Sequence, residues 1–332
     1  MRIGGLDFLR LFCAAVVFAF HALYLFVLTR QVPWTTTPEI MAITQYGYLG
    51  VQVFFMISGY VIPMSVSGKS RFQFLVGRAA RLLPAFWICL ALTVAALSVA
   101  GRPPVLAQLA ANIPIIAIMF GQPYIDGVFW SLTAEIIFYS WIFALAGSHN
   151  FPARLRVFAL AWLAWAVVDF VVDLPLDGIS NALWAPYFAI GIFIFLDQNG
   201  AKTFDRAMIC VAVAIAAAFA WKQAVGLPFA QTSGLNPVVV STIIMLMAAT
   251  AFFVVRVPMQ GRGLNVAIVC GAISYPLYLI HAEFGSILMS AVWRSAPEII
   301  PLAPAAILAI SYVVTRLEKP IAAYIRRIAP RR

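Results

Sequence analysis

Ionisable side chains stand within or at the ends of several long apolar runs of this sequence, and the informative ones are arginine, histidine and glutamate. A charge at the centre of a bilayer is costly, so such a residue usually has a partner or a function. Imidazole can take up and return a proton near neutral pH, and guanidinium forms paired hydrogen bonds with phosphate. Proton transfer beside a bound polyanion is therefore the chemistry that these residue types could perform.

Arg10 and His21 lie in the first apolar run, eleven residues apart. On a helix this spacing is about 16 Å and close to three turns, so both side chains lie on one face. Asp7 precedes Arg10 by three residues and can pair with it. Structural alternatives stay open, because Arg10 could be a topology anchor and His21 could bridge two helices.

Glu135 and Tyr139 are four residues apart and share a face of another apolar helix. A carboxylate in that position needs an arginine, a histidine or a proton. His281 lies deep in a late apolar run, at a predicted depth similar to that of His21. Here too a structural ion pair for Glu135 and a structural hydrogen bond for His281 are the alternatives.

Arg78 and Arg81 stand at the start of a further apolar run, three residues apart. This spacing projects both guanidinium groups from one helix face, where they could grip a phosphate. Ordinary anchors at a cytoplasmic boundary would have the same composition. The arginines are predicted at the inner mouth, with the imidazoles and the carboxylate deeper, which would suit a polyanionic donor entering from the cytoplasm.

The composition places these residues in a membrane protein. The chain has 332 residues, of which 64% are hydrophobic and 10% charged, whereas a soluble domain carries about 25% charged residues. The net charge of +10 could suggest a nucleic-acid partner, but such hydrophobicity argues against one, and the charge is better explained by membrane topology. The scattered histidines and the deep carboxylate lack metal-ligand spacing, so no metal site is predicted.

Runs long enough to cross a bilayer, about 20 residues each, predict an all-α bundle of about ten transmembrane helices. An eleventh run, 105–120, is short and interrupted by Asn112 and Pro114, and is expected to be re-entrant or to lie on the surface. The ten predicted spans are 8–28, 47–66, 76–99, 129–147, 157–173, 181–197, 207–222, 237–256, 266–288 and 299–316.

The basic residues predict the orientation of these spans, because Lys and Arg are retained on the cytoplasmic side. If 105–120 does not cross, both termini are cytoplasmic and few of the 22 basic residues face outward. If it does cross, most of them face outward. The first arrangement is preferred, and its outward-facing basic residues are Arg30, Arg102, Lys222 and Arg294.

Six blocks, taken in order along the chain, resemble the motifs of the membrane-bound acyltransferase-3 family. Each block alone is weak, but the ordered set is specific and covers the chain from 6 to 320. The central region 150–260 matches no motif and is expected to shape the acceptor site. The blocks are 6–10 followed by His21, 50–60, 74–84, 129–139, 273–281 and 317–320.

The resemblance implies an O-acyltransferase, most often an O-acetyltransferase, that modifies a hydroxyl of a cell-surface or secreted glycan such as lipopolysaccharide or exopolysaccharide. Its donor would be acetyl-CoA or another acyl-CoA, bound as a substrate, with no permanently bound cofactor. A single domain over 1–332 is expected, with no appended soluble domain, in the lipid bilayer of a bacterial inner (plasma) membrane.

We assign expected roles within that reaction. His21 would be the general base or a transient acyl-histidine relay, and Glu135 would orient the imidazole or hold the acceptor. His281 would polarise the thioester or share the proton transfer. Arg78 and Arg81 would bind the CoA phosphates, with Arg10 as a weaker candidate. Further hydrogen-bond donors around these groups are expected to be Ser58, Ser131 and Tyr139.

A multispan transporter or permease for a small polar or acylated substrate is the rival function. Intramembrane ionisable residues and broken helices also mark transport pathways. The sequence shows no inverted repeat with paired interrupted helices, which disfavours a transporter. Consumption of a thioester distinguishes the two functions, because a pure transporter consumes none.

Overall fold

The computed structural model describes residues 3–66, 68–172, 180–200, 202–226 and 234–327. Every regular element within those ranges is helical. Nine helical segments of the described chain are long and apolar enough to cross a membrane. The prediction of an all-α, multipass membrane protein is therefore confirmed.

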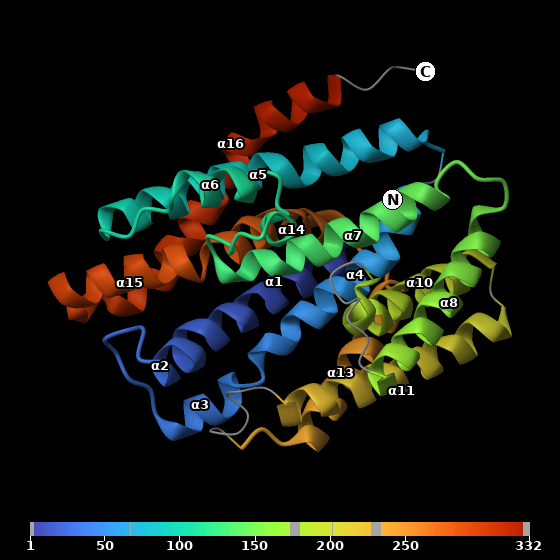
Figure 1. Ribbon diagram of the computed structural model, residues 1–332, viewed down its shortest axis with the longest axis horizontal. Helices are drawn as coiled ribbons and strands as arrows, with labels where there is room; N and C mark the ends of the chain where they lie inside the picture. Colours follow the sequence, from blue (N-terminus) through green and yellow to red (C-terminus); the bar gives the residue numbers. More distant parts are fainter. Residues whose placement is uncertain (1–2, 67, 173–179, 201, 227–233, 328–332) are drawn as a thin grey trace.

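The helices form one bundle whose members run along a shared direction (Figure 1). The first helix, α1 (Gly4–Phe20), begins toward the same end of the bundle at which the last helix, α16 (Ala303–Arg327), finishes. Termini at the same end of the bundle are expected when a chain crosses the membrane an even number of times. The other long helices are α4 (Gly50–Met64), α5 (Arg71–Val99), α7 (Trp130–Leu145), α8 (Phe151–Val172), α10 (Ala185–Gly200), α11 (Thr203–Gly226), α13 (Pro237–Val254), α14 (Gly261–Ile280) and α15 (Glu283–Ser295).

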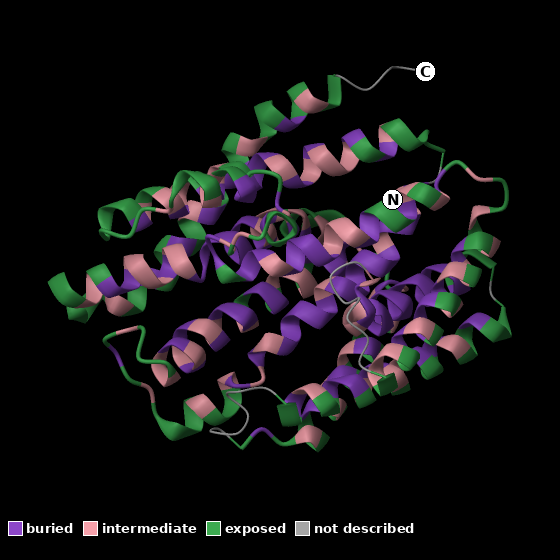
Figure 2. Ribbon diagram, viewed as in Figure 1, coloured by how far each residue is buried: buried purple, intermediate pink, exposed green. Residues whose placement is uncertain are grey.

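Helix α10 corresponds to the predicted span 181–197 but is shorter than the nine candidate spans. Its 16 residues extend about 24 Å. It packs against α4, α8 and α11, and both it and α4 are largely buried (Figure 2). Neighbouring protein therefore encloses α10, which makes it the centre of this half of the bundle.

Two glycines allow α4 and α10 to approach closely. A Cβ atom added to Gly59 would lie 2.0 Å from the carbonyl oxygen of Phe188, and one added to Gly191 would lie 2.0 Å from that of Met56. Small residues at helix crossings allow such backbone contact in membrane proteins. The crossing sets the position of α4, which carries part of the candidate site.

The first helix changes its winding at His21. The α-helix ends at Phe20, and residues His21–Leu25 form a single π turn before α2 (Phe26–Leu28). The following loop holds this turn, since Trp34 Nε1 donates a hydrogen bond to the Ala22 carbonyl and Thr36 Oγ1 donates one to the Leu23 carbonyl. Turns of this kind are frequent at functional sites.

The predicted span 266–288 is wrong in one respect, because it is two helices and not one. Helix α14 ends at Ile280 and α15 begins at Glu283. Asp126 explains the break: its Oδ2 accepts a hydrogen bond from the Glu283 N–H at 2.9 Å, and its Oδ1 accepts one from the Val128 N–H at 3.1 Å. One buried carboxylate thus caps two helix starts, and burial raises its pKa to about 7.

Segment 105–120 does not form a spanning helix, as predicted. It contains α6 (Leu106–Asn112) and a short 3-10 turn (Ala117–Phe120). The Asn112 side chain holds the irregular backbone, because its Nδ2 donates to the Gln108 and Pro123 carbonyls and its Oδ1 accepts from the Ile125 N–H. These bonds satisfy backbone groups that an irregular segment would otherwise leave exposed to lipid.

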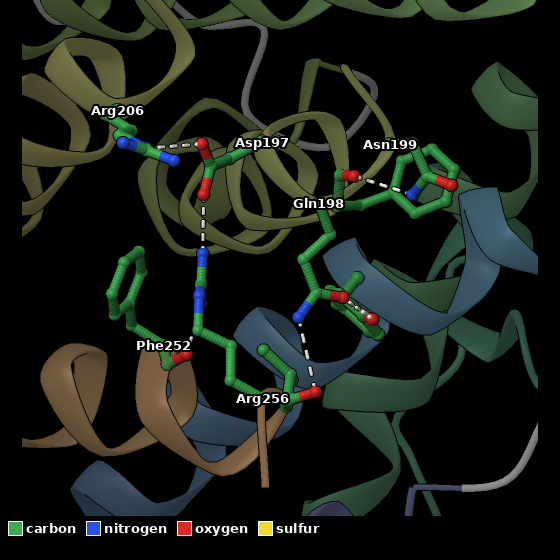
Figure 3. A network of polar contacts seen from close by, with 9 residues as sticks. Asp197, Gln198, Asn199, Arg206, Phe252 and Arg256 are labelled. Carbon is green, nitrogen blue, oxygen red and sulfur yellow. Dashed lines mark hydrogen bonds and ion pairs between the residues drawn. The ribbon is translucent and has the colours of Figure 1, made fainter. Parts of the chain in front are cut away.

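Two buried carboxylates tie together helices of the central region. Asp197, near the end of α10, accepts hydrogen bonds from Arg206 Nε at 2.8 Å and from Arg256 Nη2 at 2.5 Å (Figure 3). Asp205 accepts two bonds from Arg156, at 2.7 and 2.8 Å. Asp197 thus joins α10 to α11 and to the segment that follows α13, and Asp205 joins α11 to α8.

Candidate functional site

Two adjoining cavities lie inside the bundle, and every candidate residue except His281 lines one of them. His281 instead contacts His21. The first, here called the arginine cavity, has a volume of about 210 Å³. The second, here called the histidine cavity, has a volume of about 460 Å³ and is lined by His21. Val51 and Tyr278 line both, so they form the boundary. The predicted residues in the arginine cavity are Arg10, Arg78, Arg81, Glu135, Ser58, Ser131 and Tyr139.

Three guanidinium groups face the arginine cavity against one carboxylate. Arg10 is paired with Asp7 at 3.1 Å, and Arg81 lies 5.6 Å from the centre of the Tyr275 ring. Arg78 Nε is buried and has no hydrogen-bond partner among the described residues. A buried donor without a partner is costly, so the cavity is electrostatically and geometrically suited to an anion.

A third cavity, here called the terminal cavity, continues from the arginine cavity toward the chain ends. It has a volume of about 380 Å³ and shares Arg10 and Arg81 with the arginine cavity. Its lining also includes Glu318 and Arg326 of α16. The two arginines thus stand where a route from the end of the bundle that carries the termini would enter the arginine cavity.

Glu135 belongs to a hydrogen-bonded cluster inside the arginine cavity. Its Oε1 accepts from Ser58 Oγ on α4 and from Tyr139 Oη on α7, both at 2.6 Å. Of the two roles expected for Glu135, orienting the imidazole has no contact to support it, because the hydrogen bonds of His21 go to Val17 and His281. The structure therefore brings Glu135 together with the arginines. Holding the acceptor stays a prediction.

His21 and His281 form a direct pair, although 260 residues separate them. His281 is fully buried, and its Nδ1 lies 2.7 Å from the Tyr278 carbonyl, so Nδ1 carries the proton and Nε2 accepts. That Nε2 lies 3.2 Å from Nδ1 of His21, which is also 2.9 Å from the Val17 carbonyl.

The same network assigns the tautomer of His21. Two acceptors surround its Nδ1, so Nδ1 carries the proton, and Nε2 keeps the lone pair. A neutral imidazole with its lone pair toward a cavity is the form a general base requires. His281 contacts His21 and lines neither the arginine cavity nor the histidine cavity, so in this arrangement it holds the imidazole ring of His21.

Tyr278 is a site residue that sequence reasoning missed. Its hydroxyl lies 2.7 Å from Ser131 Oγ, and its ring centre lies 5.5 Å from that of His281. The sequence did offer a sign of its role, because Tyr278 stands three residues before His281 and therefore shares its helix face. Ser131 thus holds the tyrosine that separates the arginine cavity from the histidine cavity.

The described residues contain no group of three or more His, Cys, Asp or Glu side chains that could hold a metal ion. The arrangement can bind an anionic group in one cavity and remove a proton in the next. A group transferred between them would cross at Val51 and Tyr278.

Comparison with known families and proteins gives one match. A family model described as "Acyltransferase domain" matches residues 3–316, nearly the whole chain. The comparisons with curated proteins and with solved structures give no match.

Proposed function

The chain belongs to the acyltransferase-3 family, and on that premise we propose that it transfers an acyl group from acyl-CoA to a hydroxyl of a glycan. That it is an acyltransferase acting on groups other than aminoacyl groups follows from the family itself. The donor, the acceptor and the residue roles are our proposal. From the earlier resemblance, acetyl is the group we expect.

The charge of the arginine cavity supports an acyl-CoA donor. CoA is a polyanion through its phosphates, and Arg78 and Arg81 offer two guanidinium groups on one side of the route. Arg10 lines the same route but is partly neutralised by Asp7. We therefore assign phosphate binding to Arg78 and Arg81 first, with Arg10 holding α1 in place beside them.

His21 would act as the general base. Its Nε2 removes the proton of the acceptor hydroxyl as that oxygen attacks the thioester carbonyl carbon. The carbon–sulfur bond then breaks, and the proton passes from the imidazolium to the leaving thiolate. The products are an O-acyl ester and free CoA thiol, so atoms and charges balance without a metal or a redox partner.

The distribution of basic residues supports the membrane orientation that we propose, with both termini cytoplasmic. With both termini cytoplasmic, the terminal cavity opens toward the cytoplasm, where acyl-CoA is available. The histidine cavity then lies further toward the outer side, where surface glycans are modified. We propose the plasma membrane of a bacterium as the location of this reaction.

The observation that carries the proposal is the meeting of an anion-suited cavity and an imidazole-lined cavity at Val51 and Tyr278. Its test uses purified protein in detergent with acetyl-CoA and de-O-acylated surface polysaccharide. We expect His21→Ala to lose at least about a hundredfold of the transfer rate. The exposed histidine of the loop after α7 supplies the matched control, His149→Ala, which should retain full activity. Full activity in His21→Ala would exclude the base.

The donor site has a separate test. We expect Arg78→Ala combined with Arg81→Ala to weaken CoA binding by about a hundredfold or more, since hydrogen bonds to charged groups contribute about 1.5–3 kcal/mol each. Arg262→Ala, which removes an exposed arginine at the same end of the bundle, should leave binding unchanged. Unchanged CoA affinity in the double variant would contradict the phosphate assignment.

A further inference from the structure

A stack of aromatic rings runs from the protein core and ends at the histidine cavity. The ring centres of Phe138 and Phe188 lie 4.4 Å apart and those of Phe188 and Phe55 lie 4.7 Å apart, both in stacked arrangements. The ring of Trp184 follows at 5.4 Å from Phe55 and is tilted by 55°. Trp130 completes the stack at 4.7 Å from Trp184. The three phenylalanines are buried.

Only the tryptophan end of this stack is half-exposed. Trp130 and Trp184 are intermediate in exposure, and both line the histidine cavity. Packing of aromatic rings in the core does not require an exposed indole. Core packing therefore does not explain why Trp130 and Trp184 line a cavity that His21 also lines. An aromatic platform beside a base is a means of holding a substrate ring.

Polar groups converge on the same cavity from other elements. Gln52 of α4 and Gln223 of α11 line it together with His21. Ligand sites are typically apolar clefts with a few placed polar groups, and the volume of about 460 Å³ falls within their usual range of about 300–1,000 Å³. Leu183, Trp184 and Gln223 come from the central region, which matches no sequence motif.

We propose that the histidine cavity is the acceptor subsite and that Trp130 and Trp184 stack against the C–H face of a pyranose ring, with the hydroxyl to be acylated toward His21. A pyranose has one apolar face and a rim of hydroxyls, which matches a cavity lined by two indoles, the Gln223 amide and an imidazole. A lipid tail would offer no hydrogen bond to the Gln223 amide and no hydroxyl to the base. This inference rests on the proposed function for its reaction, whereas sugar binding itself does not require turnover.

The kinetic test separates acceptor from donor. We expect Trp184→Ala to raise the KM for de-O-acylated polysaccharide by about tenfold and to leave the KM for acetyl-CoA unchanged. Trp184→Phe keeps a flat ring and should recover most of the acceptor affinity. The control Trp221→Ala removes an exposed tryptophan of α11 outside the cavity and should change neither constant.

A binding test needs no catalysis. Methyl hexopyranosides are added to purified protein, and the melting temperature is recorded for wild type, His21→Ala, Trp184→Ala and Trp184→Phe. A ligand of the folded state raises this temperature. We expect the increase in wild type, in His21→Ala and in Trp184→Phe, and its loss in Trp184→Ala.

Each outcome bears on one claim. An unchanged acceptor KM in Trp184→Ala, or no stabilisation of the wild type by any methyl hexopyranoside, would overturn the pyranose subsite. Stabilisation by dodecanol alone would assign the cavity to an alkyl chain and would overturn it as well. Absence of acyl transfer by wild type to any acceptor, with sugar binding intact, would instead contradict the proposed reaction.

Discussion

Replacement of Gly191 by alanine tests the crossing that positions the site. The new Cβ would lie 2.0 Å from the Met56 carbonyl oxygen and 2.6 Å from the Tyr60 nitrogen, and ordinary contact begins at 3.4 Å. Both obstacles are backbone, so no side chain can rotate away. Helices α4 and α10 must therefore separate by about 1.4 Å at this point, a value set by those distances.

The free-energy cost follows from that separation. Overpacking of a tight interior costs about 1–3 kcal/mol, and weakening the adjacent Phe55–Phe188 stack, whose ring centres lie 4.7 Å apart, adds about 0.5–1.5 kcal/mol. We expect Gly191→Ala to destabilise the protein by about 2–4 kcal/mol. Because α4 carries Ser58 and Val51, a displacement of this size should also reduce acyl transfer.

The assay is thermal unfolding in a fixed detergent, followed by tryptophan fluorescence, with acyl transfer measured in parallel. Gly200→Ala is the matched control, since it lies on the same helix and a Cβ there would meet nothing within 4 Å. It should leave stability unchanged or raise it by up to about 1 kcal/mol. Equal melting temperatures for Gly191→Ala and Gly200→Ala would refute the close-crossing argument.

Three further predictions concern His281, the π turn that begins at His21 and the cap formed by Asp126. His281→Phe removes the acceptor for His21 Nδ1 and should lower kcat about tenfold with the acetyl-CoA KM unchanged. His281→Gln keeps a polar side chain and should recover part of the rate, so equal rates in the two variants would refute the positioning role. Trp34→Phe keeps an aromatic ring but loses the indole N–H that donates to the Ala22 carbonyl in the π turn, so kcat should fall about fivefold with the fold intact. An unchanged kcat would contradict the role of that bond. Burial raises the pKa of Asp126 from 3.8 to about 7, so its contribution to stability is present below about pH 4 and is lost as the pH rises to about 7. The difference in unfolding free energy between wild type and Asp126→Asn should therefore fall by up to about 4 kcal/mol across that pH window. A difference that does not change with pH would contradict this prediction.

Much of the fold followed from the sequence because a bilayer imposes length and composition on each span. The apolar runs predicted helices, and Asn112 and Pro114 marked a segment that does not cross. The break after Ile280 could not be predicted, because it depends on Asp126, a residue more than 150 positions away whose carboxylate caps α15. Local periodicity contains no information about such a long-range cap.

The sequence predicted which candidate residues share a helix face, but it predicted only part of how they group in space. Spacing along one helix correctly placed Arg78 with Arg81 and Glu135 with Tyr139, since both pairs share a face. Contacts between helices were not available from spacing, so the His21–His281 pair was not foreseen, and the sequence left open whether Glu135 orients the imidazole or holds the acceptor. The acids that join the central helices, Asp197 and Asp205, were missed for the same reason.

The central claim is that one acyl group passes from CoA to a hydroxyl for each turnover, with His21 as the base. The most direct measurement is the ratio of free CoA thiol released to O-acyl ester formed, using purified protein, acetyl-CoA and de-O-acylated surface polysaccharide. We predict a ratio of one in wild type and the loss of both products in His21→Ala, which should still bind CoA. Thiol release without ester formation, or equal ester formation in His21→Ala, would contradict the account.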